Sequence, residues 1–136
     1  MKKRMARAAE RGMTLIEIMV VLVILGMIAA AVAVNVKKKM DEAEIRQAKT
    51  DVQNIANQGV DGFRVSKGRY PTAEEGLQIL VQEGFLKANN DKGDLRDPWG
   101  EPYVYLTPGT KHPDGFDVKS NGPDRQPGTS DDIVNF

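Results

Sequence analysis

The chain has 136 residues, of which 40% are hydrophobic, with 19 basic and 19 acidic side chains and no cysteine. This length allows one small domain besides an apolar segment, and the balanced charge gives no reason to expect binding to nucleic acid. The absence of cysteine excludes disulfides and thiolate metal sites.

The first twelve residues are strongly basic, with five Lys or Arg side chains against the single acidic residue Glu10. A basic front before a long apolar run is typical of an export signal, so we interpret residues 1–12 as a leader peptide. Its removal leaves 14 basic and 18 acidic residues, a formal net charge of −4.

Residues 18–34 form an uninterrupted apolar stretch, which Met13 and the residues after it lengthen. At about 1.5 Å per residue, such a helix approaches the roughly 30 Å of a bilayer core. We therefore predict a transmembrane helix over residues 13–36. The basic residues near its two ends are equal in number, so the positive-inside rule leaves its orientation open. A secretory signal peptide cleaved after the small residues 31–33, or a plain signal anchor, is an alternative interpretation.

One carboxylate, Glu17, lies inside the start of this apolar run. A charge in hydrocarbon costs a few kcal/mol or more, so an ionisable residue at this depth is expected to have a function and a partner. No Lys or Arg occurs between Met13 and Asn35, so we expect no partner within the segment.

The helix is predicted to continue beyond the apolar run, because no proline occurs between Lys37 and Ser66. Apolar or small residues recur there at spacings of three and four, which predicts a helix covered on one face. That stripe consists of Ile45, Ala48, Val52, Ile55, Gly59 and Phe63. We expect the helix to end near Gly68, since glycine favours helix termination.

The next segments carry a helix signal and a strand signal. Thr72 and Glu75 have the spacing of a capping box, which predicts a short helix to about Gln82. A Pro- and Gly-rich turn at residues 97–100 then leads into a strand in which Tyr103 and Tyr105 share a face.

The C-terminal part reads as two strands, at residues 116–120 and 133–136, joined by a loop with two Pro, two Gly and three Asp. The aspartates are Asp124, Asp131 and Asp132. Clustered carboxylates without His or Cys suit a hard, oxygen-preferring cation. The spacing alone is equally compatible with solvated aspartates in a turn.

We find no pattern for catalysis. The single histidine, His112, lies in a turn sequence and is expected to face solvent. No nucleophile motif or phosphate-binding loop occurs, so we expect a chain that is not an enzyme.

The residues around the start of the apolar run are Gly12-Met13-Thr14-Leu15-Ile16-Glu17. This run resembles the processing site of type IV prepilins and pseudopilins. The resemblance implies that a prepilin peptidase cleaves after Gly12 and that the new amine of Met13 is methylated. It also implies that Glu17 neutralises that amine on a neighbouring copy. Most members of the family have Phe where this chain has Met13.

Two further motifs, Tyr-Pro-Thr-x-Glu-x-Gly-Leu from residue 70 and Asp-Pro-Trp-Gly-x-Pro-Tyr from residue 97, resemble the major pseudopilins of the type II secretion system. The resemblance implies a type IV pilin-like α+β fold: a long N-terminal helix, a short helix in the connecting loop and a small antiparallel sheet. Residues 37–136 would form the periplasmic domain. It further implies one structural Ca²⁺ in the C-terminal loop. Its ligands would be the carboxylates of Asp124, Asp131 and Asp132 and the backbone carbonyls of Asn121 and Gln126.

The function implied by the resemblance is that of a structural subunit of the type II secretion pseudopilus, a periplasmic filament that drives export of folded proteins. The implied partners are other copies of the chain, minor pseudopilins, the inner-membrane assembly platform with its ATPase, and the prepilin peptidase. The chain would cross the inner membrane once, with its C-terminal domain in the periplasm. A pilin of a type IV pilus or DNA-uptake system is the alternative, and an anchored sensor or binding domain is a further class.

Overall fold

The computed structural model describes residues 12–136, so the predicted leader lies outside the described residues except for Gly12. The chain divides into two compact units, Met1–Lys39 and Met40–Phe136. Helix α1, Leu15–Asn54, begins in the first unit and ends in the second.

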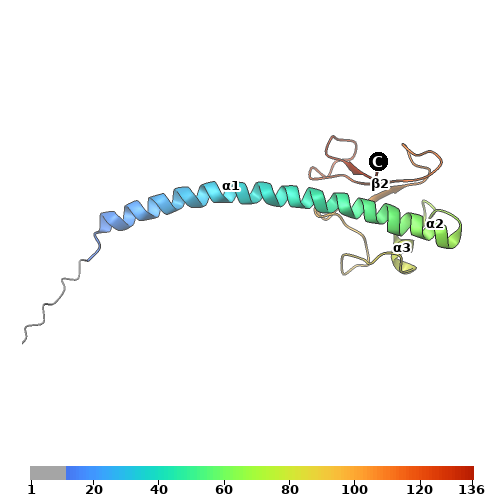
Figure 1. Cartoon of the computed structure of the whole chain (residues 1–136), viewed down its shortest axis with the longest axis horizontal. Coiled ribbons are helices and arrows are strands. Elements are labelled where there is room, and N and C mark those ends of the chain that lie inside the picture. The colour runs from blue at the N-terminus through green and yellow to red at the C-terminus, as the bar shows by residue number, and fades with distance from the viewer. Residues whose placement is uncertain (1–11) are drawn as a thin grey trace, which may run out of the picture. The chain divides into compact units, whose positions relative to one another are not determined.

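The described part of the first unit consists almost entirely of α1 (Figure 1). The helical run Leu15–Lys67 contains a window long and apolar enough to cross a membrane, and none of that window is buried. The large side chains of Ile16, Leu22 and Met27 are each more than 60% exposed. This stretch therefore offers a fully apolar helix surface to lipid or to other helices.

The predicted continuous helix is confirmed, since α1 runs on into η1, Ile55–Asp61, and α2, Gly62–Lys67. It ends where the sequence predicts. Gly68 adopts a left-handed conformation with φ 73°, and its N–H donates to the carbonyl of Arg64. This is a common glycine C-cap.

The sequence did not predict that η1 is a π-helix. A π-helical segment accommodates an extra residue within a helix and shifts the face that the following residues present. Gly59, within this segment, is in tight contact with the chain after α2: a Cβ built there would lie 2.7 Å from Cδ1 of Leu86 and 2.9 Å from Cδ1 of Leu80. The absence of a side chain at Gly59 thus lets the chain after α2 pack directly on the helix.

The short helix predicted from Thr72 is wrong in its extent, because α3 spans only Gln78–Gln82. The capping box itself forms: the N–H of Thr72 donates to Glu75, and the N–H of Glu75 donates to the Thr72 hydroxyl. Gly76 then adopts φ 56°, which leaves the right-handed helical region. Residues 73–77 therefore form turns rather than a helix.

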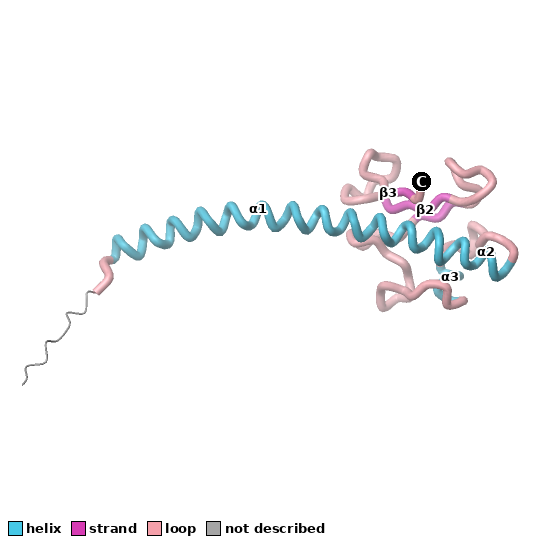
Figure 2. Tube along the Cα trace, viewed as in Figure 1, coloured by secondary structure: helices cyan, strands magenta, loops and turns pink. Residues whose placement is uncertain are grey.

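Three short strands form one antiparallel sheet in the order β1-β2-β3. They are β1, Val104–Leu106, β2, Asp117–Ser120, and β3, Ile133–Val134. The other described residues form loops and turns (Figure 2). The α+β, type IV pilin-like arrangement predicted from the sequence is confirmed.

The core of the second unit lies between the helical run and β2, which packs against η1. Most of the predicted helical stripe is buried there, while Ile45 lies at its margin. Tyr103 and Phe116 join it from the other side, and Trp99 and Tyr105 pack against it in part, as expected for aromatic anchors beside a turn. The buried hydrophobic residues are Ala48, Val52, Ile55, Ala56, Val60, Phe63, Leu80, Tyr103, Phe116, Val118 and Ile133.

Candidate functional site

Glu17 lies in the first turn of α1 and accepts hydrogen bonds from Thr14. The backbone N–H of Thr14 is 3.0 Å from Oε2 of Glu17, and the Thr14 hydroxyl is 3.1 Å from the same atom. In return, the N–H of Glu17 lies 3.3 Å from the Thr14 hydroxyl oxygen. These reciprocal contacts form a capping box, with Thr14 as N-cap and Glu17 at the third helical position.

The expectation that Glu17 has no partner within its own segment is therefore wrong. The sequence lacks a cation there, but Thr14 supplies two neutral donors, and the Thr-x-x-Glu spacing would have revealed them. The capping box also explains why α1 begins at Leu15. Met13, at the predicted processing site, lies just before it and is 76% exposed.

The predicted metal-binding loop, residues 121–132, connects β2 to β3. Its two ends are held together by the pairing of Ser120 with Ile133. Close to this junction, Gly122 adopts φ 73° and packs against residue 131: a Cβ built on Gly122 would overlap the carbonyl oxygen of Asp131. The two ends of the loop are thus in direct backbone contact.

Two side-chain oxygens in this loop are buried without a hydrogen-bond partner, Oδ1 of Asn121 and Oδ1 of Asp132. Unpaired buried oxygens are rare, because losing hydration without a replacement costs free energy. The other carboxylate oxygen of Asp132 is well bonded, since it accepts from Nζ of Lys119 at 2.9 Å and from the N–H of Gly128 at 3.0 Å. Asp132 therefore retains one free oxygen beside a lysine.

The charge state of Asp132 follows from the same contacts. Burial alone would raise its pKa, but hydrogen bonds from Lys119 and from the N–H of Gly128 hold the pKa below its ordinary value. Asp132 is accordingly an anionic group at neutral pH.

The other predicted ligands make hydrogen bonds with residues close to them in the sequence. Asp124 is exposed and accepts from the N–H of Gln126 in a local turn, while the carbonyl of Gln126 accepts from the Thr129 hydroxyl. Asp131 is also exposed. Within residues 12–136, no three His, Cys, Asp or Glu side chains gather into a group that could hold a metal ion. The structure thus brings the two ends of the loop together and leaves Asp124 exposed to solvent.

His112 is exposed, as expected from its turn sequence, and it also contacts a buried carboxylate. Its side chain is half-exposed, and Nδ1 lies 2.8 Å from Oδ1 of Asp117, a carboxylate that is almost fully buried in β2. Burial would raise the pKa of Asp117, but hydrogen bonds from the N–H of Lys111 and from His112 lower it overall. The pair fastens the 107–115 loop onto the sheet, which is a structural role.

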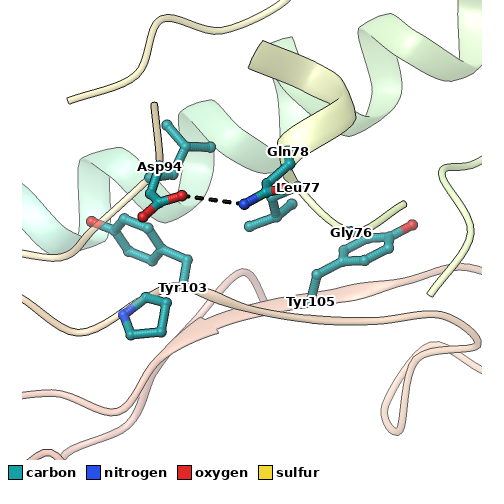
Figure 3. Close-up of a pocket in the computed structure, with 8 residues that line it drawn as sticks. Gly76, Leu77, Gln78, Asp94, Tyr103 and Tyr105 are labelled. Atoms are coloured by element: carbon teal, nitrogen blue, oxygen red, sulfur yellow. Dashed lines mark hydrogen bonds between the residues drawn. The ribbon is translucent and has the colours of Figure 1, made fainter. Parts of the chain in front are cut away.

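A separate cleft of about 360 Å³ lies between the segment around α3 and β1. Figure 3 shows Tyr103 and Tyr105 along one side of it, and Nε2 of Gln78 donates to Oδ1 of Asp94 at 3.2 Å across from them. Both tyrosines line the same cleft, as predicted for side chains on one face of a strand. None of the predicted site residues lies here.

Comparison with known proteins places these features in context. A family model described as type II secretion system protein G matches residues 35–136, and one described as the prokaryotic N-terminal methylation motif matches residues 7–33. A relative from Pseudomonas aeruginosa called type II secretion system core protein G is 43% identical, over 97% of this chain and 99% of the relative. The Escherichia coli protein of the same name is 38% identical, over 93% of this chain and 91% of the relative.

A solved structure is also similar. The crystal structure of the major pseudopilin from the type 2 secretion system of enterohaemorrhagic Escherichia coli matches with a TM-score of 0.59 and 32% identity. The match covers 72% of this chain and 87% of that one.

Proposed function

The chain belongs to the type II secretion system protein G family, and from this premise we propose that it is a structural subunit of the type II secretion pseudopilus. The observation that carries the proposal is the first part of α1, an apolar helix surface that is exposed along its whole length. A surface of this kind needs lipid or other helices to cover it. The alternative of a type IV pilus or DNA-uptake pilin is not favoured, because the matching family is that of secretion.

The proposed life of the subunit has two stages. After a prepilin peptidase removes residues 1–12, the apolar helix crosses the inner membrane once and the C-terminal unit lies in the periplasm. An assembly platform with its ATPase then extracts the subunit, and copies pack their helices into a filament beneath a tip of minor pseudopilins. Identical head-to-tail contacts that do not close generate an open helical assembly. In this role the chain is a structural subunit and not an enzyme, and growth of the filament that it forms drives export.

The first test is the intact mass of the chain extracted from membranes of cells that contain a prepilin peptidase. We expect a species that comprises residues 13–136 and carries one added methyl group on the amine of Met13. Cleavage after Gly12 creates the cation that Glu17 is proposed to meet on a neighbouring copy.

Two other masses would contradict the proposal. A species beginning at Val34 would indicate an ordinary exported domain without the apolar helix. An uncut chain would indicate a permanent membrane anchor. In either case the amine proposed as the partner of Glu17 would not exist.

We also propose that the 121–132 loop binds one structural Ca²⁺. The supporting observation is the pair of unpartnered oxygens on Asn121 and Asp132, because hard cations prefer neutral and anionic oxygen ligands. Asp124 and Asp131 would contribute carboxylates, and the backbone carbonyls of Asn121 and Gln126 would contribute further oxygens, with the loop contracting around the ion. The ion would neutralise the aspartates and hold the loop that carries β3.

Calcium should raise the thermal stability of the full-length chain in detergent. For a dissociation constant of about 10⁻⁴ to 10⁻³ M, 10 mM free Ca²⁺ adds roughly 1 to 3 kcal/mol to the free energy of unfolding. Near-UV circular dichroism during heating would measure this shift in Tm. Mg²⁺ at the same concentration serves as the control, and an equal Tm in Ca²⁺ and in chelator would contradict the proposal.

Lys119 should weaken this binding, because its ammonium already occupies one oxygen of Asp132. We expect Lys119→Met to lower the dissociation constant for Ca²⁺ about tenfold. This corresponds to a gain of about 1.4 kcal/mol in the free energy of binding, because the ammonium no longer competes with the ion for Asp132. Lys111→Met is the matched control, since Lys111 contacts Asp117 through its backbone N–H. Calorimetric titration would measure both, and unchanged affinity in Lys119→Met would show that the lysine does not compete.

A further inference from the structure

Asp97 is a buried carboxylate to which the proposed function assigns no part. It is 5% exposed and begins the Asp-Pro-Trp-Gly turn. Its Oδ1 accepts from the N–H of Trp99 at 3.1 Å and from the N–H of Glu101 at 2.8 Å. A buried carboxylate is costly unless its oxygens are bonded in this way. These two hydrogen bonds stabilise the turn. The second carboxylate oxygen, Oδ2, takes no part in them.

Oδ2 of Asp97 accepts from the hydroxyl of Ser120 at 2.6 Å. Ser120 is the last residue of β2 and is fully buried. Because the Ser120 hydroxyl donates its hydrogen to Asp97, the hydroxyl oxygen can accept a hydrogen bond from another donor. That oxygen receives the N–H of Gly122 at 3.1 Å. One continuous chain of hydrogen bonds therefore runs from Asp97 through Ser120 to Gly122.

This chain ends at the junction of the 121–132 loop. Gly122 packs against the backbone of Asp131, so the position of Gly122 determines how closely the two ends of the loop approach. Asn121, whose Oδ1 has no partner, lies between Ser120 and Gly122 in the sequence. Asp132, which carries the other unpartnered oxygen, follows directly after Asp131.

We propose that Asp97 and Ser120 are positioning residues for the cation-binding loop, through the hydrogen bond that Ser120 accepts from Gly122. This inference rests on the proposed calcium site and adds two residues that would not touch the ion. Partners that orient ligands from outside the coordination shell change metal affinity by about 10- to 100-fold when removed. The Asp-Pro-Trp-Gly turn would then position the loop although Asp97 and Ser120 are 23 positions apart in the sequence.

The test is the dissociation constant for Ca²⁺, measured by calorimetric titration of the full-length chain in detergent. We expect both Ser120→Ala and Asp97→Asn to weaken binding at least about tenfold. Because the two residues act through one chain of hydrogen bonds, the affinity of the double variant for Ca²⁺ should be only slightly lower than that of the single variant with the lower affinity. Phe63→Leu, a core change where the ring packs on Phe85, is the control for lost stability and should bind Ca²⁺ as the wild type does.

The outcomes separate the two proposals. If the wild type binds and Ser120→Ala binds equally well, the positioning role is overturned while the calcium site stands. Strictly additive effects on the free energy of binding would likewise overturn the coupling between Asp97 and Ser120. If Phe63→Leu weakens binding as much as Ser120→Ala, general stability and not positioning sets the affinity. If the wild type itself does not bind Ca²⁺, the calcium site fails and the inference fails with it.

Discussion

Glu17→Ala should insert into the membrane and be cleaved after Gly12, but it should fail to assemble into filaments. The substitution removes the carboxylate that is proposed to pair with the amine of Met13 on a neighbouring copy. Leaving one member of a buried ion pair alone costs about 3 to 5 kcal/mol, which weakens each subunit contact by roughly 10²- to 4 × 10³-fold. Shearing filaments from cells and quantifying the chain by immunoblot would measure the loss.

Glu17→Gln distinguishes the two roles that the structure gives this side chain. An amide oxygen can still accept from Thr14, so the capping box and the start of α1 are retained. It cannot neutralise an amine, so this variant should also fail to assemble. Filaments of normal abundance from Glu17→Gln would show that the carboxylate acts only on its own helix.

Gly122→Ala should destabilise the C-terminal unit by about 3 kcal/mol or more. The left-handed conformation alone costs an alanine roughly 1 to 2 kcal/mol. In addition, the new Cβ would overlap the carbonyl oxygen of Asp131 and lie 2.8 Å from its carbonyl carbon, so the backbone would have to move. Urea titration followed by near-UV circular dichroism would measure the free energy of unfolding.

Gly128→Ala is the matched control in the same loop. Gly128 has φ 86°, yet a Cβ built there meets nothing within 4 Å. It therefore bears the conformational cost without the overlap and should lose only about 1 to 2 kcal/mol. Equal losses in the two variants would mean that the contact between Gly122 and Asp131 contributes nothing to stability.

Periodicity and glycine placement predicted much of this fold. The stripe of apolar residues from Ala48 to Phe63 indicated which face of the helix is buried, and Gly68 indicated where the helix ends. Both signals are local, and the tertiary structure agrees with them. The alternation of Phe116, Val118 and Ser120 likewise indicated the strand β2, although Asp117 on its other face is buried as well.

One failed prediction has a local cause that competes with a correct signal, and the other involves contact with a distant segment. Thr72 and Glu75 do form their capping box, but Gly76 takes a positive φ and ends the turn before a helix can propagate. The close approach of Leu80 and Leu86 to Gly59 in the π-helix η1 joins segments distant in the sequence, and no nearby sequence pattern encodes it. Contacts made by distant segments are invisible to periodicity.

The candidate site was predicted only in outline. The composition of the 121–132 loop indicated oxygen ligands. Asp132 carries an unpartnered carboxylate oxygen, whereas in Asn121, named for its backbone carbonyl, the unpartnered oxygen belongs to the side chain. Lys119, Ser120 and Asp97 could not be found in the same way, because their relation to the loop depends on how β2 and the turn pack. The capping box at Thr14 and Glu17 follows from the Thr-x-x-Glu spacing, which requires no cation.

The brevity of the outer strands limits how copies of this chain can associate. β1 and β3 are the two edges of the sheet, and they have only three and two residues. A strand edge carries unpaired N–H and C=O groups that can bind the edge of another molecule, and short edges offer few of them. Subunits crowded in an assembly would therefore have little opportunity to join their sheets into a continuous, amyloid-like ladder. In the proposed filament, contacts between copies would then fall to other surfaces, above all the exposed apolar part of α1.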